Sequence, residues 1–196
     1  MFRIQHRVNN ISQLKNTPIN LGVEVDIRST DGRLITNHDP ITKGEDFEYW
    51  LEHYSHAFLI LNVKEEGLEE LIISLMKKNN IYNFFFLDQS FPFLIKTAKS
   101  GESRCAVRVS EFESIETAMS LSGKVDWAWI DCFTLFPLSN LEANRLQSEG
   151  GFKLCFVSPE LQRDVSNDEI ISFRNYIESL GIHGDAVCTK RPELWY

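Results

Sequence analysis

The sequence predicts a compact α/β protein with a single-domain (β/α)8 (TIM) barrel. Short apolar runs alternate with helical patterns along the whole chain, and eight such runs occur. Several runs are almost continuously apolar, as at residues 58–61 and 154–157, which is typical of parallel strands covered on both faces. Eight strands alternating with helices favour a closed barrel over an open sheet. The chain of 196 residues is short for that fold.

The strands are expected at residues 2–6, 21–27, 58–63, 83–88, 104–109, 126–131, 152–157 and 184–188. Helices are expected at 66–79, 111–121 and 168–180, where apolar residues recur at helical spacing. The last helix follows a capping residue, Ser166, and Gly181 is a natural terminator. Residues 8–20 include Pro18 and can form at most a short helix. No repeat or linker divides residues 1–196, so we expect one domain.

Composition excludes several classes of protein. Hydrophobic residues make up 43% and aromatic residues 12% of the chain, which argues against disorder. The net charge of −8 argues against a nucleic-acid partner and against attraction to anionic membranes. The first residues form no apolar signal region, and no apolar run is long enough to insert stably in a bilayer. The cytoplasm is therefore the default location. The four cysteines form no C-x-x-C motif.

Polar residues lie at or near the carboxyl ends of the expected strands, where barrel enzymes build their active sites. They are His6, Arg7, Glu24, Asp26, Lys64, Asp88, Arg108 and Asp131. Glu24 and Asp26 are at alternate strand positions and point to one face. Two buried carboxylates repel unless a proton or a cation intervenes, and oxygen ligands suit Mg²⁺ or Ca²⁺, with Mn²⁺ as a further choice. Alternatively, one of the two is solvated or ion-paired.

His6 and His38 are candidates for an acid/base pair, because histidine titrates near neutral pH. Asp39 follows His38 and could orient its ring; the alternative is that each histidine caps a strand or packs against a loop. Arg7 and Lys64 could bind phosphate oxygens, or pair with the nearby carboxylates. Phe91, Trp127, Trp129 and Phe133 are expected mostly in the core or at the rim, with an apolar substrate wall as the alternative.

The block from residue 6 to residue 39 resembles the glycerophosphodiester phosphodiesterase family, as a divergent and compact member. It contains His6-Arg7, Glu24-Val25-Asp26, Ser29-Thr30-Asp31-Gly32 and His38-Asp39. Farther along, Asn62-Val63-Lys64 and Thr189-Lys190-Arg191-Pro192 echo two other family motifs. The resemblance implies a barrel and a small-molecule phosphodiester substrate. It assigns catalysis to His6 and His38, metal binding to Glu24 and Asp26 with Asn62, and phosphate binding to Arg7 and Lys64.

The chain departs from the family pattern in several places. Asn62 stands where a third acidic ligand is expected, and its carbonyl oxygen can coordinate a cation without adding charge. Asp88 is the best substitute for the missing carboxylate. The segment between Arg7 and Glu24 is short, and Lys190 replaces the usual acid. The lobe through which many family members close over glycerol is absent.

The favoured function is metal-dependent hydrolysis of a glycerophosphodiester-like or sugar-linked phosphodiester. One alternative is a noncatalytic binder of a phosphorylated ligand on the same barrel, which Asn62 favours. Another is a lyase that forms a cyclic phosphate with the same acid/base pair. The sequence leaves the oligomeric state and the alcohol groups of the substrate open.

Overall fold

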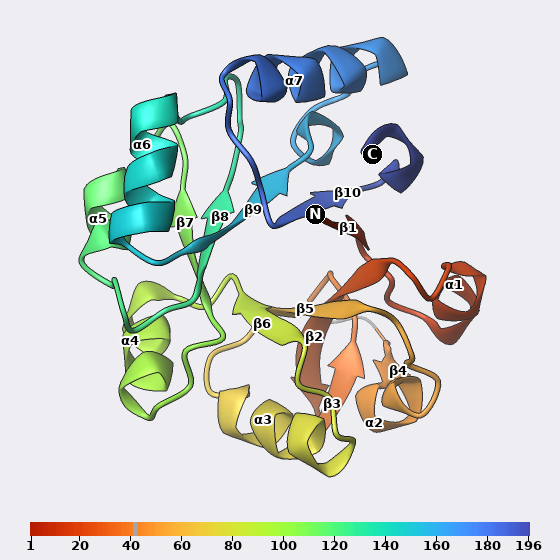
Figure 1. Cartoon of the computed structure of the whole chain (residues 1–196). Coiled ribbons are helices and arrows are strands. Elements are labelled where there is room, and N and C mark those ends of the chain that lie inside the picture. The colour runs from red at the N-terminus through yellow and green to blue at the C-terminus, as the bar shows by residue number, and fades with distance from the viewer. Residues whose placement is uncertain (41–42) are drawn as a thin grey trace.

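The computed structural model describes residues 1–40 and 43–196 and shows a curled sheet surrounded by helices (Figure 1). Its strands are β1 (Phe2–Gln5), β2 (Gly22–Thr30), β3 (Arg33–Thr36), β4 (Glu45–Asp46), β5 (Phe58–Val63), β6 (Phe84–Leu87), β7 (Ala106–Val109), β8 (Trp127–Ile130), β9 (Lys153–Val157) and β10 (Ala186–Thr189). Its α-helices are α1 (Ile11–Asn16), α2 (Phe47–Leu51), α3 (Glu69–Lys78), α4 (Phe91–Lys99), α5 (Ile115–Met119), α6 (Asn140–Asn144) and α7 (Asn167–Ser179).

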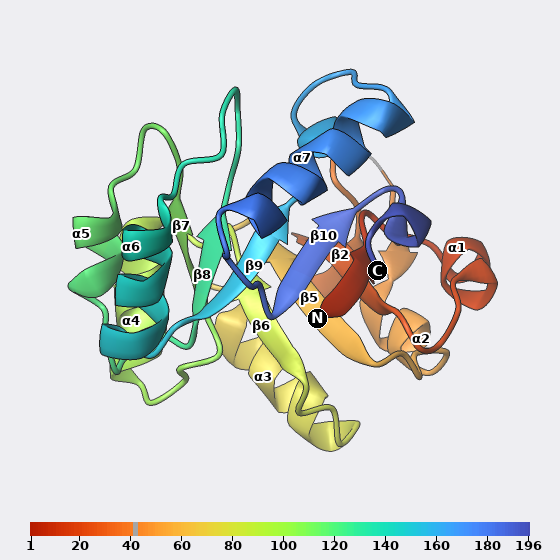
Figure 2. The same cartoon turned by 45° about the horizontal axis from the view of Figure 1, so that its top comes forward.

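Eight strands run parallel in the order β6-β5-β2-β1-β10-β9-β8-β7. The first and last strands of the chain therefore pair, and both termini lie at that junction (Figure 2). β3 pairs antiparallel with the carboxyl-terminal part of β2, and β4 pairs antiparallel with β3. We refer to these two short strands as the β3–β4 hairpin. Between β6 and β7 the pairing is reduced to one bridge, Phe86 with Cys105. The sheet thus curls through eight strands, but its two edges meet only at this bridge.

The hydrophobic core has two parts because residues on each strand alternate between the two faces of the sheet. The inner part lies inside the curl and includes Ile4, Ile60, Phe85, Trp127 and Trp129. The outer part lies between the strands and the helices. This arrangement explains why β5 and β6 are buried at every position. At Gly22 a Cβ atom would lie 2.9 Å from Cγ1 of Ile4, so the close approach of β1 and β2 requires glycine.

All eight strands expected from the sequence are present; the strand at 58–63 has the expected bounds, and the ends of the others shift by at most three residues. Two of the three expected helices are shorter than predicted, and the third, α7, is shifted by one residue; it begins with the Ser166 cap and ends before Gly181, whose φ is +69°. The prediction of a fully closed barrel needs correction, since the β6–β7 junction has a single bridge. The sequence did not predict the β3–β4 hairpin, α2, α4 or α6.

The carboxyl ends of the parallel strands meet at one end of the curl, as expected for this architecture. Within the described residues, no helix has the length and apolar character needed to cross a membrane.

Candidate active site

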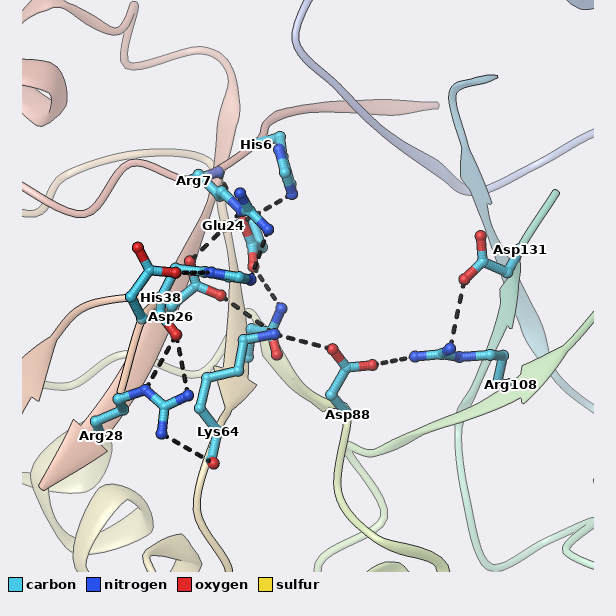
Figure 3. A network of polar contacts seen from close by, with 12 residues as sticks. His6, Arg7, Glu24, Asp26, Arg28, His38, Lys64, Asp88, Arg108 and Asp131 are labelled. Carbon is cyan, nitrogen blue, oxygen red and sulfur yellow. Dashed lines mark hydrogen bonds and ion pairs between the residues drawn. The ribbon is translucent and has the colours of Figure 1, made fainter. Parts of the chain in front are cut away.

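A cavity of about 240 Å³ opens at the carboxyl ends of the strands. Of the residues predicted for the site, it is lined by His6, Arg7, Glu24, His38, Asn62 and Lys64. Asp26, the remaining one, is fully buried beside this cavity and within ion-pair distance of two of its cations. The structure therefore brings all seven residues together, although they come from β2, β5 and the segments that follow β1, β3 and β5. Figure 3 labels six of them.

Glu24 and Asp26 lie on β2 with no exposed surface. The backbone N–H of Arg7 donates to Glu24 Oε2 at 2.7 Å, and the amide of Asn62 donates to Oε1 at 2.8 Å. Burial, followed by the nearby charge of Asp26, raises the pKa of Glu24 well above its usual range. The arrangement therefore favours either a proton on Glu24 or a cation that offsets the charge of the pair.

Asn9 holds Asp26 and was not predicted as a site residue. Its side-chain amide donates to Asp26 Oδ2 at 2.7 Å, and its carbonyl oxygen accepts the backbone N–H of Asp26 at 2.9 Å. This two-way contact ties the β1–α1 loop to β2. The sequence signal was weak, because a lone asparagine three residues after His6 is typical of any turn.

His6 follows β1, and 14% of its side chain is exposed. Its Nε2 lies 3.8 Å from Glu24 Oε2, and its Nδ1 is buried with no hydrogen-bond partner. Burial lowers the pKa of His6 to about 3, and the charges of Arg7 and Lys190 act in the same direction. The ring is therefore neutral near pH 7, and one of its nitrogens is available as a hydrogen-bond acceptor.

His38 follows β3 and is held at three points. Its Nδ1 lies 2.8 Å from Asp39 Oδ1, and its Nε2 lies 2.6 Å from Nη2 of Arg7. Because a guanidinium only donates hydrogen bonds, Nε2 is the accepting nitrogen and Nδ1 carries the proton toward Asp39. Arg28, a further residue the sequence did not single out, donates from Nε and Nη2 to the backbone carbonyl of His38, each at 3.0 Å.

Lys64, after β5, begins a row of alternating charges across the site (Figure 3). Its ammonium lies 3.3 Å from Asp26 Oδ1 and 3.1 Å from Asp88 Oδ2. Asp88 in turn pairs with Arg108, whose Nη1 lies 3.7 Å from Asp131 Oδ2. Burial alone would raise the pKa of Asp88, but the two cations outweigh it and lower that pKa. The row ends at Arg108 and Asp131, which also line the active-site cavity, a role the sequence did not assign to Arg108.

Arg7 and Asp88 share an unusual backbone conformation. Their φ angles are +55° and +59°, a region that residues with a Cβ seldom adopt. Asp88 directly follows β6 and Arg7 is the second residue after β1, and both side chains make ion pairs with other site residues. Such strain at a group of interacting polar residues points to function at this place rather than to packing.

The residues predicted to bind a metal offer the oxygen ligands that a hard cation prefers. Glu24, Asp26 and Asn62 supply only oxygen, and Asn62 Oδ1 is buried without a hydrogen-bond partner. A buried acceptor without a hydrogen-bond partner lowers the stability of the fold unless a ligand or an ion binds it. In the part of the chain that the structure describes, no group of three His, Cys, Asp or Glu residues is placed to hold a metal. Asp88 does not fill the gap, since it pairs with Lys64 and Arg108.

Two solved structures have a similar arrangement of the whole chain. A glycerophosphodiester phosphodiesterase from Agrobacterium tumefaciens str. C58 gives a TM-score of 0.66 at 13% identity, with 100% of this chain and 99% of that chain covered. A glycerophosphoryl diester phosphodiesterase from Parabacteroides distasonis ATCC 8503 gives 0.67 at 13% identity, with 98% and 84% covered.

The chain has the fold of the glycerophosphodiester phosphodiesterases. The resemblance seen at residues 6–39 is thereby confirmed for the fold, and the curled sheet corresponds to the barrel of that family. The sequence matches no family model and no curated protein.

Proposed function

We propose that this chain hydrolyses a small-molecule phosphodiester, of the glycerophosphodiester type or linked to a sugar, with a divalent cation. The observation that carries the proposal is the convergence of His6, His38 and Arg7 on one cavity beside two buried carboxylates. Proton transfer and charge neutralisation are what this reaction needs. The fold shared with two glycerophosphodiester phosphodiesterases supports the same function.

The two histidines have different proton-transfer roles. His6 accepts the proton of the attacking water, because its ring is neutral near pH 7 and Glu24 beside Nε2 offsets the charge that the ring gains. His38 gives a proton to the leaving oxygen, because Asp39 holds Nδ1 and so leaves Nε2 as the nitrogen that can face the substrate. For this step Nε2 must carry a proton, so Arg7 has to release that atom. A bound phosphate provides a competing partner for the guanidinium.

The remaining residues bind the phosphate and the cation. A divalent cation, when bound, would withdraw charge from the nonbridging oxygens, and Glu24, Asp26 and Asn62 would hold it. Arg7 offers its planar fork to one edge of the phosphate, and Lys64 offers a point charge. Mg²⁺, Ca²⁺ and Mn²⁺ are all compatible with this oxygen donor set.

A second candidate function is noncatalytic binding of a phosphorylated ligand. The observation that favours it is the ammonium of Lys64 between Asp26 and Asp88, which already neutralises part of the metal site. Asn62 adds no negative charge there. A lyase that forms a cyclic phosphate is a variant of the enzyme proposal with the same residues.

A panel of phosphodiesters tests the enzyme proposal. The purified chain is assayed in chelator and then with Mg²⁺, Mn²⁺ or Ca²⁺. We expect activity only with a metal. Full activity in excess chelator would contradict the role of the cation, and binding of glycerophosphate without turnover of any diester would favour the second candidate.

A further inference from the structure

A larger cavity, of about 560 Å³, lies next to the candidate active site. We call it the β6–β7 pocket, because its walls come from the end of β6, the start of α4, β7 and the segment from Phe112 to Thr117. Two helices that contribute to its walls, α4 and α5, lie on the same side of the sheet in Figure 1. None of the residues proposed for catalysis or metal binding lines it.

The pocket exists because the sheet is weakly joined at this point. The single bridge between β6 and β7 is Phe86 with Cys105. Beyond it, toward the carboxyl ends, Leu87 on β6 and Ala106 and Val107 on β7 line the space. At a fully paired junction, adjacent parallel strands lie about 4.8 Å apart and leave no such room.

Leu87, Asp88 and Arg108 line both this pocket and the active-site cavity. The two spaces therefore share a wall, and the ion pair of Asp88 with Arg108 lies in it. A group attached to a phosphate at Arg108 would pass this pair to reach the β6–β7 pocket. The rims are also linked, because the ring of Phe112 packs against Phe133 at a centroid distance of 5.8 Å, and Phe133 lines the active-site cavity.

Half of the residues that line the pocket are apolar. They are Leu87, Phe91, Leu94, Ala106, Val107 and Phe112, and Phe112 is 79% exposed. The larger polar side chains there already have partners: Asp88 and Arg108 pair with each other, and Glu113 accepts from Ser110 at 2.7 Å. Gln89 donates to Glu69 and Thr97 and keeps one free acceptor, Oε1. The polar groups left for a bound alcohol are Gln89 Oε1 and the hydroxyls of Ser114 and Thr117, fewer than the six apolar side chains that a hydrocarbon group can contact.

We propose that the β6–β7 pocket binds an apolar alcohol group, alkyl or aryl, of the phosphodiester substrate. This inference rests on the proposed function for the position of the phosphate. It specifies the substrate class further: one alcohol is long and apolar, not a second glycerol. Apolar contact in a preformed pocket is favourable because it removes hydrocarbon surface from water.

A chain-length series gives the first test. Three phosphodiesters share a glyceryl group and carry a methyl, butyl or octyl group on the other side, so the leaving oxygens have similar basicity. We expect kcat/KM to rise along the series, by about fourfold for each methylene that becomes buried. A flat series with measurable turnover would overturn the pocket proposal and leave the proposed hydrolysis intact.

Two variants test whether the dependence of kcat/KM on chain length arises in this pocket. Phe112→Ala removes an exposed wall, and Thr117→Trp fills space from α5. Both should reduce the advantage of octyl over methyl by about tenfold while the methyl ester is cleaved at the normal rate. Tyr82→Ala is the matched control, because Tyr82 is 61% exposed and precedes the amino end of β6. An unchanged octyl advantage in both pocket variants would contradict the assignment.

A binding measurement tests the pocket independently of catalytic turnover. Calorimetric titration of each protein with methyl phosphate and with octyl phosphate, below its micellar concentration, requires no catalysis. We expect tighter binding of octyl phosphate to the wild type and loss of that difference in Phe112→Ala and Thr117→Trp. If that result occurs without turnover of any diester, the pocket stands and the proposed hydrolysis fails. Equal affinity for both phosphates would refute the pocket.

Discussion

The guanidinium of Arg7 lies 2.6 Å from Nε2 of His38. The backbone N–H of Arg7 meanwhile donates to Glu24, and Nε lies 3.9 Å from Asp26. One residue therefore joins the proposed acid to the buried carboxylates. While Arg7 remains on Nε2, His38 cannot carry a proton at that atom. Phosphate binding and the readiness of His38 for proton transfer are thus coupled through Arg7.

Arg7→Lys tests this coupling. Lysine keeps the positive charge and has the same conformational free-energy cost at a φ of +55°, but it lacks the planar guanidinium. We expect KM for the phosphodiester to rise about tenfold, the size of one lost charge-assisted hydrogen bond. Steady-state kinetics of the variant check this. Arg33→Lys, on the exposed end of β3, is the control, and an unchanged KM in Arg7→Lys would remove Arg7 from phosphate binding.

His6→Ala and His38→Ala should each lower kcat by about 10²–10⁴, the usual contribution of a general acid or base. Neither change removes a large part of the core, so circular dichroism and the melting temperature should remain close to the wild type. His183→Ala, in the exposed loop before β10, serves as the control. A histidine whose alanine variant keeps nearly full activity has no place in the mechanism.

The strands could be predicted because their buried positions are occupied by short runs of apolar residues. Residues 58–63 are buried at every position, and a short apolar run of that kind has few alternatives. The β3–β4 hairpin was missed because only Leu34 and Ile35 mark it, and α4 because its apolar residues cluster in 91–95 and show no helical spacing. The weak β6–β7 junction depends on distant packing, so no local pattern indicates it.

The seven site residues were predicted from motif order and strand ends, and they converge in space. Their contacts were not predictable. The contact of Arg7 with His38 joins residues 31 positions apart, and the support from Asn9 and Arg28 comes through loop geometry. The positive φ of Asp88 likewise results from tertiary structure, since aspartate does not itself require that conformation.

Asn62→Glu tests the proposed metal site. Asn62 is 5% exposed and donates to Glu24, so a carboxylate there adds a third negative charge to a buried group. We expect a lower melting temperature than the wild type in chelator, and recovery with tighter binding when Mg²⁺ or Mn²⁺ is added. Asn62→Ala should bind the metal more weakly. Equal affinities of all three proteins in calorimetric titration would show that Asn62 is not a ligand.

Glu111 links the loops after β7 and β8. Burial alone would raise its pKa, but backbone N–H groups of Leu135, Thr134 and Phe133 lower it to about 2. Because the folded pKa is below the unfolded value, this stabilisation is present above about pH 4.5 and is lost as the pH falls toward 2.

We therefore expect Glu111→Gln to lower the melting temperature at pH 7 and to reduce its decline between about pH 4.5 and 2. Thermal melts across that range check the difference. Glu52→Gln, at an exposed carboxylate after α2, is the matched control. Parallel pH profiles of wild type and Glu111→Gln would mean that these N–H contacts do not stabilise the fold.

Phosphorus NMR of the products, with the reaction run in ¹⁸O-labelled water and Mg²⁺, tests hydrolysis at this site most directly. We expect the diester resonance to give a phosphomonoester that carries ¹⁸O, and we expect its formation to require both His6 and His38. A cyclic phosphate that contains no ¹⁸O as the final product would contradict hydrolysis in favour of the lyase. An unchanged diester with every metal and substrate tried would contradict the enzyme itself.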